Sequence, residues 1–216
     1  MSDPSIHHAD HDGDLAQRDS LRRVVLIVAG LNLAYFFVEA SVAWAIGSAS
    51  LLADSVDFLE DVSVNLLIFL ALRWTLAARA RAGRAMAGII CLPAVAAAWQ
   101  IVAKVQDPHA PEILSLVFTA GGAAVVNGIC ALILTRWRTH GGSLSRAAFL
   151  SARNDVLVNV AIIAMGVLTA FTGSGWPDIV LAAVILIVNL SAAKEVWEVA
   201  GEESLAAKAL AGEDID

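Results

Sequence analysis

Long apolar runs alternate with short polar segments along this chain of 216 residues. We read the pattern in windows of about 20 residues, the helix length that crosses a hydrocarbon core roughly 30 Å thick. A buried helix of a soluble protein rarely needs more than about 14 apolar residues, so the pattern predicts membrane-spanning helices. The expected spans are residues 24–46, 51–72, 85–104, 113–135, 147–170 and 177–195.

Composition supports this prediction, because 58% of the residues are hydrophobic and the mean hydropathy is +0.72. Both values are above those of ordinary soluble domains. We therefore expect an all-α, polytopic membrane protein with six transmembrane helices. Its predicted parts are an acidic, His-containing tail at 1–22, a six-helix domain at 23–195 and a short tail at 196–216, the last with one short amphipathic helix.

The basic residues predict the orientation. Of the 14 Lys and Arg residues, only Lys104 falls on the side opposite to the others. Positive charge gathers on the cytoplasmic side, so both tails should be cytoplasmic and the protein should be a multi-pass protein of the cell's inner (plasma) membrane. The first residues lack the pattern of a cleavable signal peptide. The net charge of −7 lies mainly in the tails, and we expect no nucleic-acid partner.

The second expected span is unusual because its sequence LLADSVDFLED contains Asp54, Asp57, Glu60 and Asp61. Residues four apart in a helix lie about 40° apart around the axis, so Asp57 and Asp61 share a face. Asp54 extends that polar stripe, whereas Glu60 lies about 60° away from it. An unpaired Asp near the bilayer centre costs on the order of 3 kcal/mol, which favours a functional reason for these carboxylates.

The fifth expected span repeats the spacing in SARNDVLVN, where Ser151, Asp155 and Asn159 are each four residues apart. Asn154 lies beside this stripe, and Arg153 should point away from it. Hydrogen bonding between helices is an alternative role, and it suits Asn and Ser better than it suits carboxylates. The two helices are therefore expected to present oxygen-bearing stripes to each other.

Facing carboxylates repel one another at low dielectric, and a divalent cation removes that repulsion by replacing protons. Metal ligands must be deprotonated, so binding and proton release are coupled at the same oxygens. Nothing in the sequence matches a Cys-x-x-Cys, phosphate-loop or His-Glu-x-x-His motif, so we expect neither an enzyme nor a bound cofactor. The candidate metal ligands are Asp57, Asp61, Asp155, Ser151, Asp54, Asn154 and Asn159.

These residues resemble the cation diffusion facilitator family of divalent-metal transporters. The likeness covers the first two and last two spans, and includes Glu39, the segment GSASLLAD and Asp178 at the start of the sixth span. The resemblance implies efflux of a divalent transition metal from the cytoplasm by exchange with protons. It also implies a mid-membrane transport site at Asp57, Asp61, Ser151 and Asp155.

Two departures from the family pattern affect these expectations. Ser151 stands where the family commonly has His or Asp, so Asn154, Asn159, Asp54 or a water would complete an all-oxygen site. The family favours zinc or cadmium, whereas oxygen ligands favour manganese, iron or cobalt; zinc-like ions stay the first expectation. We also expect the family's cytoplasmic metal-binding domain to be lacking, because the roughly 20 residues after the sixth span are too few to form one.

The expected partners are a divalent metal ion, protons and the lipid bilayer, and a homodimer stays open. The acidic first tail, with His7, His8 and His11, either captures metal loosely or is an ordinary solvated tail. Two other functions also stay open. One is a metal-binding membrane scaffold, and the other is an uncoupled metal channel.

Overall fold

The computed structural model describes residues 4–71, 74–136 and 142–211, and these residues form six α-helices. All the elements in this part of the chain are helical, which confirms the all-α prediction. The expected span 113–135 coincides with α4, and the other spans lie inside longer or slightly shifted helices. The helices are α1 (Pro4–Ile46), α2 (Ala49–Ala71), α3 (Leu76–Gln106), α4 (Ile113–Thr135), α5 (Gly142–Thr172) and α6 (Trp176–Ala211).

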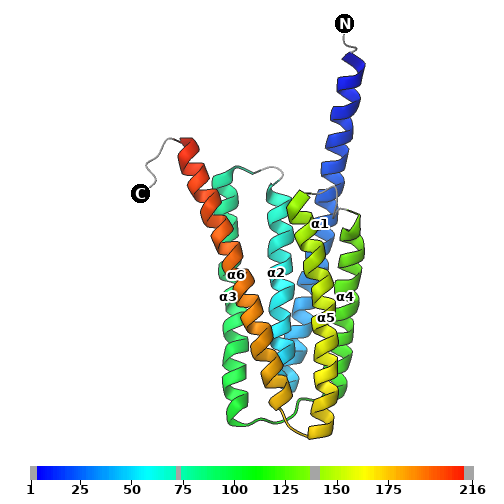
Figure 1. The fold of residues 1–216 in the computed structure, drawn as a ribbon, viewed down its shortest axis with the longest axis vertical. Coiled ribbons are helices and arrows are strands. Elements are labelled where there is room, and N and C mark those ends of the chain that lie inside the picture. Colours follow the sequence, from blue (N-terminus) through cyan, green and yellow to red (C-terminus); the bar gives the residue numbers. More distant parts are fainter. Residues whose placement is uncertain (1–3, 72–73, 137–141, 212–216) are drawn as a thin grey trace.

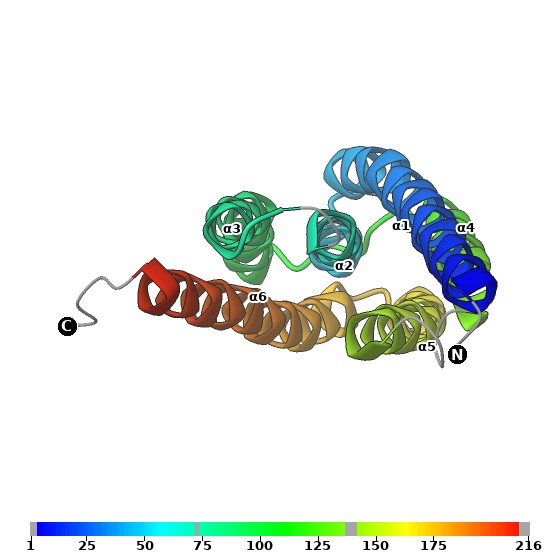
Figure 2. The ribbon, with the colours of Figure 1, turned by 90° about the horizontal axis from the view of Figure 1, so that it is seen from above.

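The helices run up and down in a bundle, with α2 at its centre (Figure 1). α2 contacts α1, α3, α5 and α6, whereas α4 packs mainly on α5 and α1. Seen along the bundle, α3, α2 and α1 form one row and α6 and α5 form a second row (Figure 2). α1 begins and α6 ends at the same end of the bundle (Figure 1). We call the opposite end, with the turns at 47–48, 107–112 and 173–175, the distal end.

Local sequence explains where several helices begin and end. Gly47 and Gly173 follow the last residues of α1 and α5 with φ of 67° and 62°, a conformation that glycine adopts without a steric penalty. Thr75 caps α3 by accepting a hydrogen bond from the Ala78 N–H. Glu112 caps α4 by accepting bonds from the N–H groups of residues 114 and 115, and these bonds lower the pKa of its carboxyl.

The two expected tails are not separate from the bundle helices. α1 begins at Pro4 and continues unbroken into the first expected span, so the segment predicted as a tail at 1–22 is helical from residue 4. α6 likewise continues through residue 195 to Ala211 in place of a separate short helix. The boundaries at 22/23 and 195/196 therefore fall inside continuous helices. The change from apolar to polar residues suggested a boundary, but polar residues can continue a helix, so composition did not predict that α1 and α6 extend through these positions.

Four helical segments are long and apolar enough to cross a membrane: Asp19–Ile46, Ala80–Gln106, Ile113–Thr135 and Ser151–Thr172. α6 has a shorter apolar stretch, Trp176–Ser191. The central helix α2 is long enough to cross a membrane, but its four carboxylates make it less apolar than these four segments. The chain thus has the character of a multi-pass membrane protein, and its most acidic helix lies in the middle of the bundle.

The exposed and buried surfaces reverse the pattern of a soluble protein. Phe171, Leu132 and Phe118 are 86%, 76% and 73% exposed, whereas many polar and charged side chains are buried. A soluble protein rarely shows so much exposed apolar surface, but lipid tails solvate it without cost.

Two buried apolar clusters pack the bundle and lie at different heights along α2. The first includes residues 49, 51–53 and 56 of α2 and lies toward the distal end. The second includes Ile68 of α2 with Val25, Val28 and Leu134 from α1 and α4. Asp57, Glu60 and Asp61 lie between these clusters along α2, so apolar packing flanks them on both sides.

Candidate metal centre

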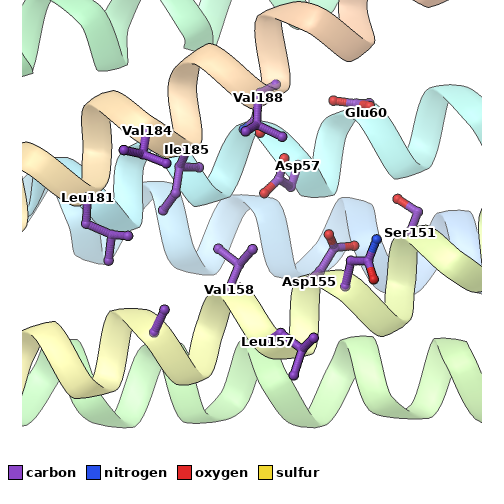
Figure 3. Close-up of a pocket in the computed structure, with 13 residues that line it drawn as sticks. Asp57, Glu60, Ser151, Asp155, Leu157, Val158, Leu181, Val184, Ile185 and Val188 are labelled. Atoms are coloured by element: carbon purple, nitrogen blue, oxygen red, sulfur yellow. The ribbon is translucent and has the colours of Figure 1, made fainter.

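The polar stripes of α2 and α5 meet inside the bundle. Asp57 on α2 and Asp155 on α5 extend toward the space between the two helices (Figure 3). Both lie among the residues that line one cavity. One turn further along α2, Asp61 contacts α5 directly, because its Oδ1 accepts a hydrogen bond of 3.0 Å from Ser151 Oγ. The four-residue spacing in each helix therefore places these oxygens at a shared interface.

Asp61 is the best-anchored carboxylate of this group. Its second oxygen, Oδ2, accepts a hydrogen bond of 3.2 Å from Asn32 Nδ2 of α1. The Asn32 amide oxygen in turn lies 3.7 Å from Cys130 Sγ of α4, which is placed to donate to it. Asp61 of α2 is thus held by side chains of α1 and α5, and it is 3% exposed. The two neutral donors orient this carboxylate without neutralising its charge.

Asn65 and Asn159 repeat one local arrangement on the two helices. Asn65 Nδ2 donates to the backbone oxygen of Asp61 at 2.8 Å, and Asn159 Nδ2 donates to that of Asp155 at 2.9 Å. In both residues the amide oxygen is buried without a hydrogen-bond partner. A buried polar atom without a partner is unusual in a folded protein. Each helix therefore carries a carboxylate and, four residues later, a neutral oxygen that is free to accept.

A cavity of about 490 Å³ lies between α2, α5 and α6. Asp57, Glu60, Ser151, Asn154 and Asp155 supply polar lining from α2 and α5, and Asn189 supplies it from α6. Aliphatic side chains, among them Val158, Leu181 and Val184, cover the rest of the wall (Figure 3). No Lys, Arg or His is among the lining residues that the structure describes. Asp57 and Asp155 therefore bring negative charge to the cavity, and the described lining brings no cationic side chain to these two carboxylates.

Two further candidate ligands lie apart from the cavity's central carboxylates. Asn154 is exposed at the edge of the cavity, and its Oδ1 accepts a hydrogen bond of 3.2 Å from Arg153. Arg153 is itself exposed. Asp54 is 1% exposed, does not line the cavity, and neither of its oxygens has a hydrogen-bond partner. It lies toward the distal end, close to Glu39 of α1.

The candidate ligands are gathered but not arranged as a complete coordination shell. Among the described residues, no three His, Cys, Asp or Glu side chains are placed so that they could hold one metal ion together. Asp61 is engaged by Asn32 and Ser151, whereas Asp57 and Asp155 line the cavity. Binding an ion with all three carboxylates would therefore require side-chain rotation or a small approach of α5 to α2.

The sequence reasoning missed Asn32 and Asn189 and gave little weight to Glu60. Asn32 contacts Asp61, Asn189 lines the cavity, and Glu60 lines it beside Asp57. Asn189 also donates to the Ala53 backbone oxygen at 2.9 Å, which ties α6 to α2. Both Asn residues are single amides within apolar runs, GLNLAY and LIVNLS. An isolated amide in a membrane helix usually seeks a partner, so that signal was available.

The distal end is closed by a second buried polar group, centred on Asp178 at the start of α6. Its Oδ1 accepts from Ser48 Oγ at 2.8 Å and from the N–H and hydroxyl of Ser50, and its Oδ2 accepts from Ala49 N at 2.8 Å. Lys104 Nζ of α3 donates to the same Oδ2 at 2.7 Å and to the Gly47 carbonyl at 2.6 Å. Lys104, the one basic residue expected on the side opposite to the others, is 3% exposed and paired within the bundle.

Comparison with known proteins does not identify a family for the chain. No protein-family model matches it, and no curated protein matches it. The assignment of function therefore depends on the site itself.

Proposed function

We propose that this chain is a membrane transporter that exports divalent transition-metal cations from the cytoplasm in exchange for protons. Asp57, Asp61 and Asp155 would bind the ion, with Ser151 as a neutral oxygen ligand. The observation that carries the proposal is a cavity inside an apolar-surfaced bundle, where carboxylates of two helices face each other without a basic side chain among the described lining residues. The function proposed is transport, not catalysis.

The cost of burying these carboxylates supports a cation as cargo. Each is taken out of water into the interior of a bundle whose outer surface suits lipid, and membrane insertion penalises a charged Asp there by about 3 kcal/mol. A divalent ion offsets that cost while it is bound, and protons offset it when the ion leaves. The same oxygens would then take up metal and protons in alternation, which is the requirement for exchange.

The ligand chemistry bears on which ion is carried. The family resemblance points to zinc or cadmium, and we keep a zinc-like ion as the first proposal. The site's oxygens come from carboxylates, hydroxyls and amides, and such ligands also suit Mn²⁺, Fe²⁺ and Co²⁺. The absence of a ligating nitrogen or sulfur from the described cavity lining favours these harder ions as competing cargo.

We further propose that all six helices cross the inner membrane and that both chain ends are cytoplasmic. Two observations support this topology. α2 and α6 pack within the bundle beside the helices that are apolar enough to span, and α1 begins where α6 ends (Figure 1). The bias of Lys and Arg toward the cytoplasmic loops would set the orientation.

Ion flux in proteoliposomes tests the proposal. The full chain is reconstituted, and uptake of Zn²⁺, Cd²⁺, Mn²⁺ and Co²⁺ is followed with an internal metal dye. We expect saturable uptake of at least one ion, and loss of that uptake in Asp155→Asn. Glu198→Gln is the matched control, because Glu198 is exposed and pairs with Lys194 in a surface contact of 3.5 Å. Equal flux in Asp155→Asn and the control would overturn the assigned site.

A further inference from the structure

A second pair of carboxylates lies beside the cavity and has no donor to satisfy it. Glu39 of α1 and Asp54 of α2 are 0% and 1% exposed, and they lie close enough to interact electrostatically. None of their four oxygens accepts a hydrogen bond. Two other buried carboxylates do have hydrogen-bond donors: Asp61 accepts from two side chains, and Asp178 accepts from several groups. A buried carboxylate without donors is costly unless something else compensates it.

The neighbouring side chains do not supply this compensation. Tyr35 lies one turn before Glu39, but its hydroxyl donates to the Thr119 backbone oxygen at 2.7 Å. Apart from Tyr35, the described side chains that interact with Glu39 and Asp54 are acidic or amide groups, and none is basic. The buried cation Lys104 pairs instead with Asp178 at the distal end.

Asn159 completes the surroundings of this pair. Its side chain reaches Asp54 from α5, it is 0% exposed, and its amide oxygen has no partner. Two carboxylates and an amide side chain from three helices therefore lie together in one buried place. Carboxylate and amide oxygens are the ligands that hard divalent cations take.

The summed charge of five carboxylates in and beside the cavity points the same way. Glu39, Asp54, Asp57, Asp61 and Asp155 carry −5 together when all are ionised, since each contributes −1. One divalent ion would leave −5 + 2 = −3, and a second would leave −3 + 2 = −1. Uncompensated charge in a low-dielectric interior is strongly unfavourable, so two ions suit this cluster better than one.

We propose that Glu39 and Asp54, with Asn159 beside them, form a second divalent-cation site. The site lies distal to the cavity, because Asp54 precedes Asp57 by three residues, about 4.5 Å along the axis of α2. Its ion class rests on the proposed function, since the same cargo would reach it through the cavity. The two sites would form a short file that leads from the cavity toward the distal end.

Equilibrium binding of Mn²⁺ to the purified full chain in lipid nanodiscs tests this proposal. Free Mn²⁺ is measured by electron paramagnetic resonance, and bound Mn²⁺ is obtained by difference. We expect two ions per wild-type chain, one in Glu39→Gln, one in Asp155→Asn and two in the exposed control Glu198→Gln. Asp54→Asn repeats the test from α2 if Glu39→Gln does not fold.

The wild-type spectrum gives a second readout that needs no variant. Two Mn²⁺ ions a few ångströms apart broaden each other's lines, whereas an isolated bound ion keeps resolved hyperfine structure. One ion per wild-type chain, with an unbroadened spectrum, lost in Asp155→Asn and kept in Glu39→Gln, would overturn the second site and leave the proposed function intact. No bound ion in any variant would overturn both.

Discussion

Replacing Lys104 by Met should destabilise the bundle far more than the same replacement at an exposed lysine. Lys104 Nζ lies 2.7 Å from Asp178 Oδ2 and 2.6 Å from the Gly47 carbonyl, and both charged side chains are 2% exposed. Met keeps the length of the side chain but removes the charge and the donor. Removing one partner of a buried ion pair typically costs about 3–5 kcal/mol. The serine and backbone donors to Asp178 remain, so we expect about 3 kcal/mol, near the lower limit.

Lys194→Met is the matched control. Lys194 pairs with Glu198 at 3.5 Å, one helical turn away, and the two side chains are 74% and 60% exposed. An exposed pair of this type contributes about 0.3–0.5 kcal/mol. Unfolding by sodium dodecyl sulfate in mixed micelles, followed by the fluorescence of the six tryptophans, would give both free energies of unfolding.

Asp178→Asn, alone and combined with Lys104→Met, completes a double-mutant cycle. Because the two side chains touch, the double variant should be more stable than the sum of the single losses predicts, by at least about 1 kcal/mol. A loss in Lys104→Met below about 1 kcal/mol, no larger than in Lys194→Met, would refute the view that this pair holds the distal end together.

Three further predictions concern the site and the first helix. Asp57→Ala, Asp61→Ala and Asp155→Ala should each abolish metal flux in proteoliposomes while circular dichroism and gel filtration stay as in wild type; near-normal flux in any of them would place the site elsewhere. Ser151→His should raise the ratio of Zn²⁺ to Mn²⁺ flux, because imidazole adds a nitrogen ligand, and an unchanged ratio would mean that this position does not reach the ion. Deleting residues 1–14 should change the apparent metal affinity by only a few-fold, and complete loss of flux would make that segment part of the transport mechanism.

The fold was predictable from the sequence where apolar runs are uniform and end in turn residues. α4 matches its expected span because Glu112 caps one end and the apolar run stops at the other. The ends of α1 and α6 were not predictable in this way, since both helices continue through polar sequence that carries no breaker. The number of membrane crossings is also harder to read at α2, where the carboxylates that suggest function lower the hydropathy of the span.

The candidate site was predictable only in part. The four-residue spacings placed Asp61 and Ser151 at one interface, and the structure joins them by a hydrogen bond. Nothing in the spacing of α2 and α5 indicated that α1 would contribute Asn32 or that α6 would contribute Asn189, because helix packing brings those residues in from distant parts of the chain. The ion pair of Lys104 was not predictable for the same reason, because its partner Asp178 on α6 is far from it in the sequence.

Metal movement driven by a pH step alone tests the central claim most directly. Proteoliposomes hold equal concentrations of metal on both sides, the membrane potential is clamped, and the internal pH stays fixed so that the internal dye is unaffected. If protons and metal exchange at the same carboxylates, acidifying the outside should draw metal out of the vesicles, and making the outside alkaline should drive metal in. Net movement of zero under both pH steps, in vesicles that pass metal down a metal gradient, would contradict exchange and leave an uncoupled channel in its place.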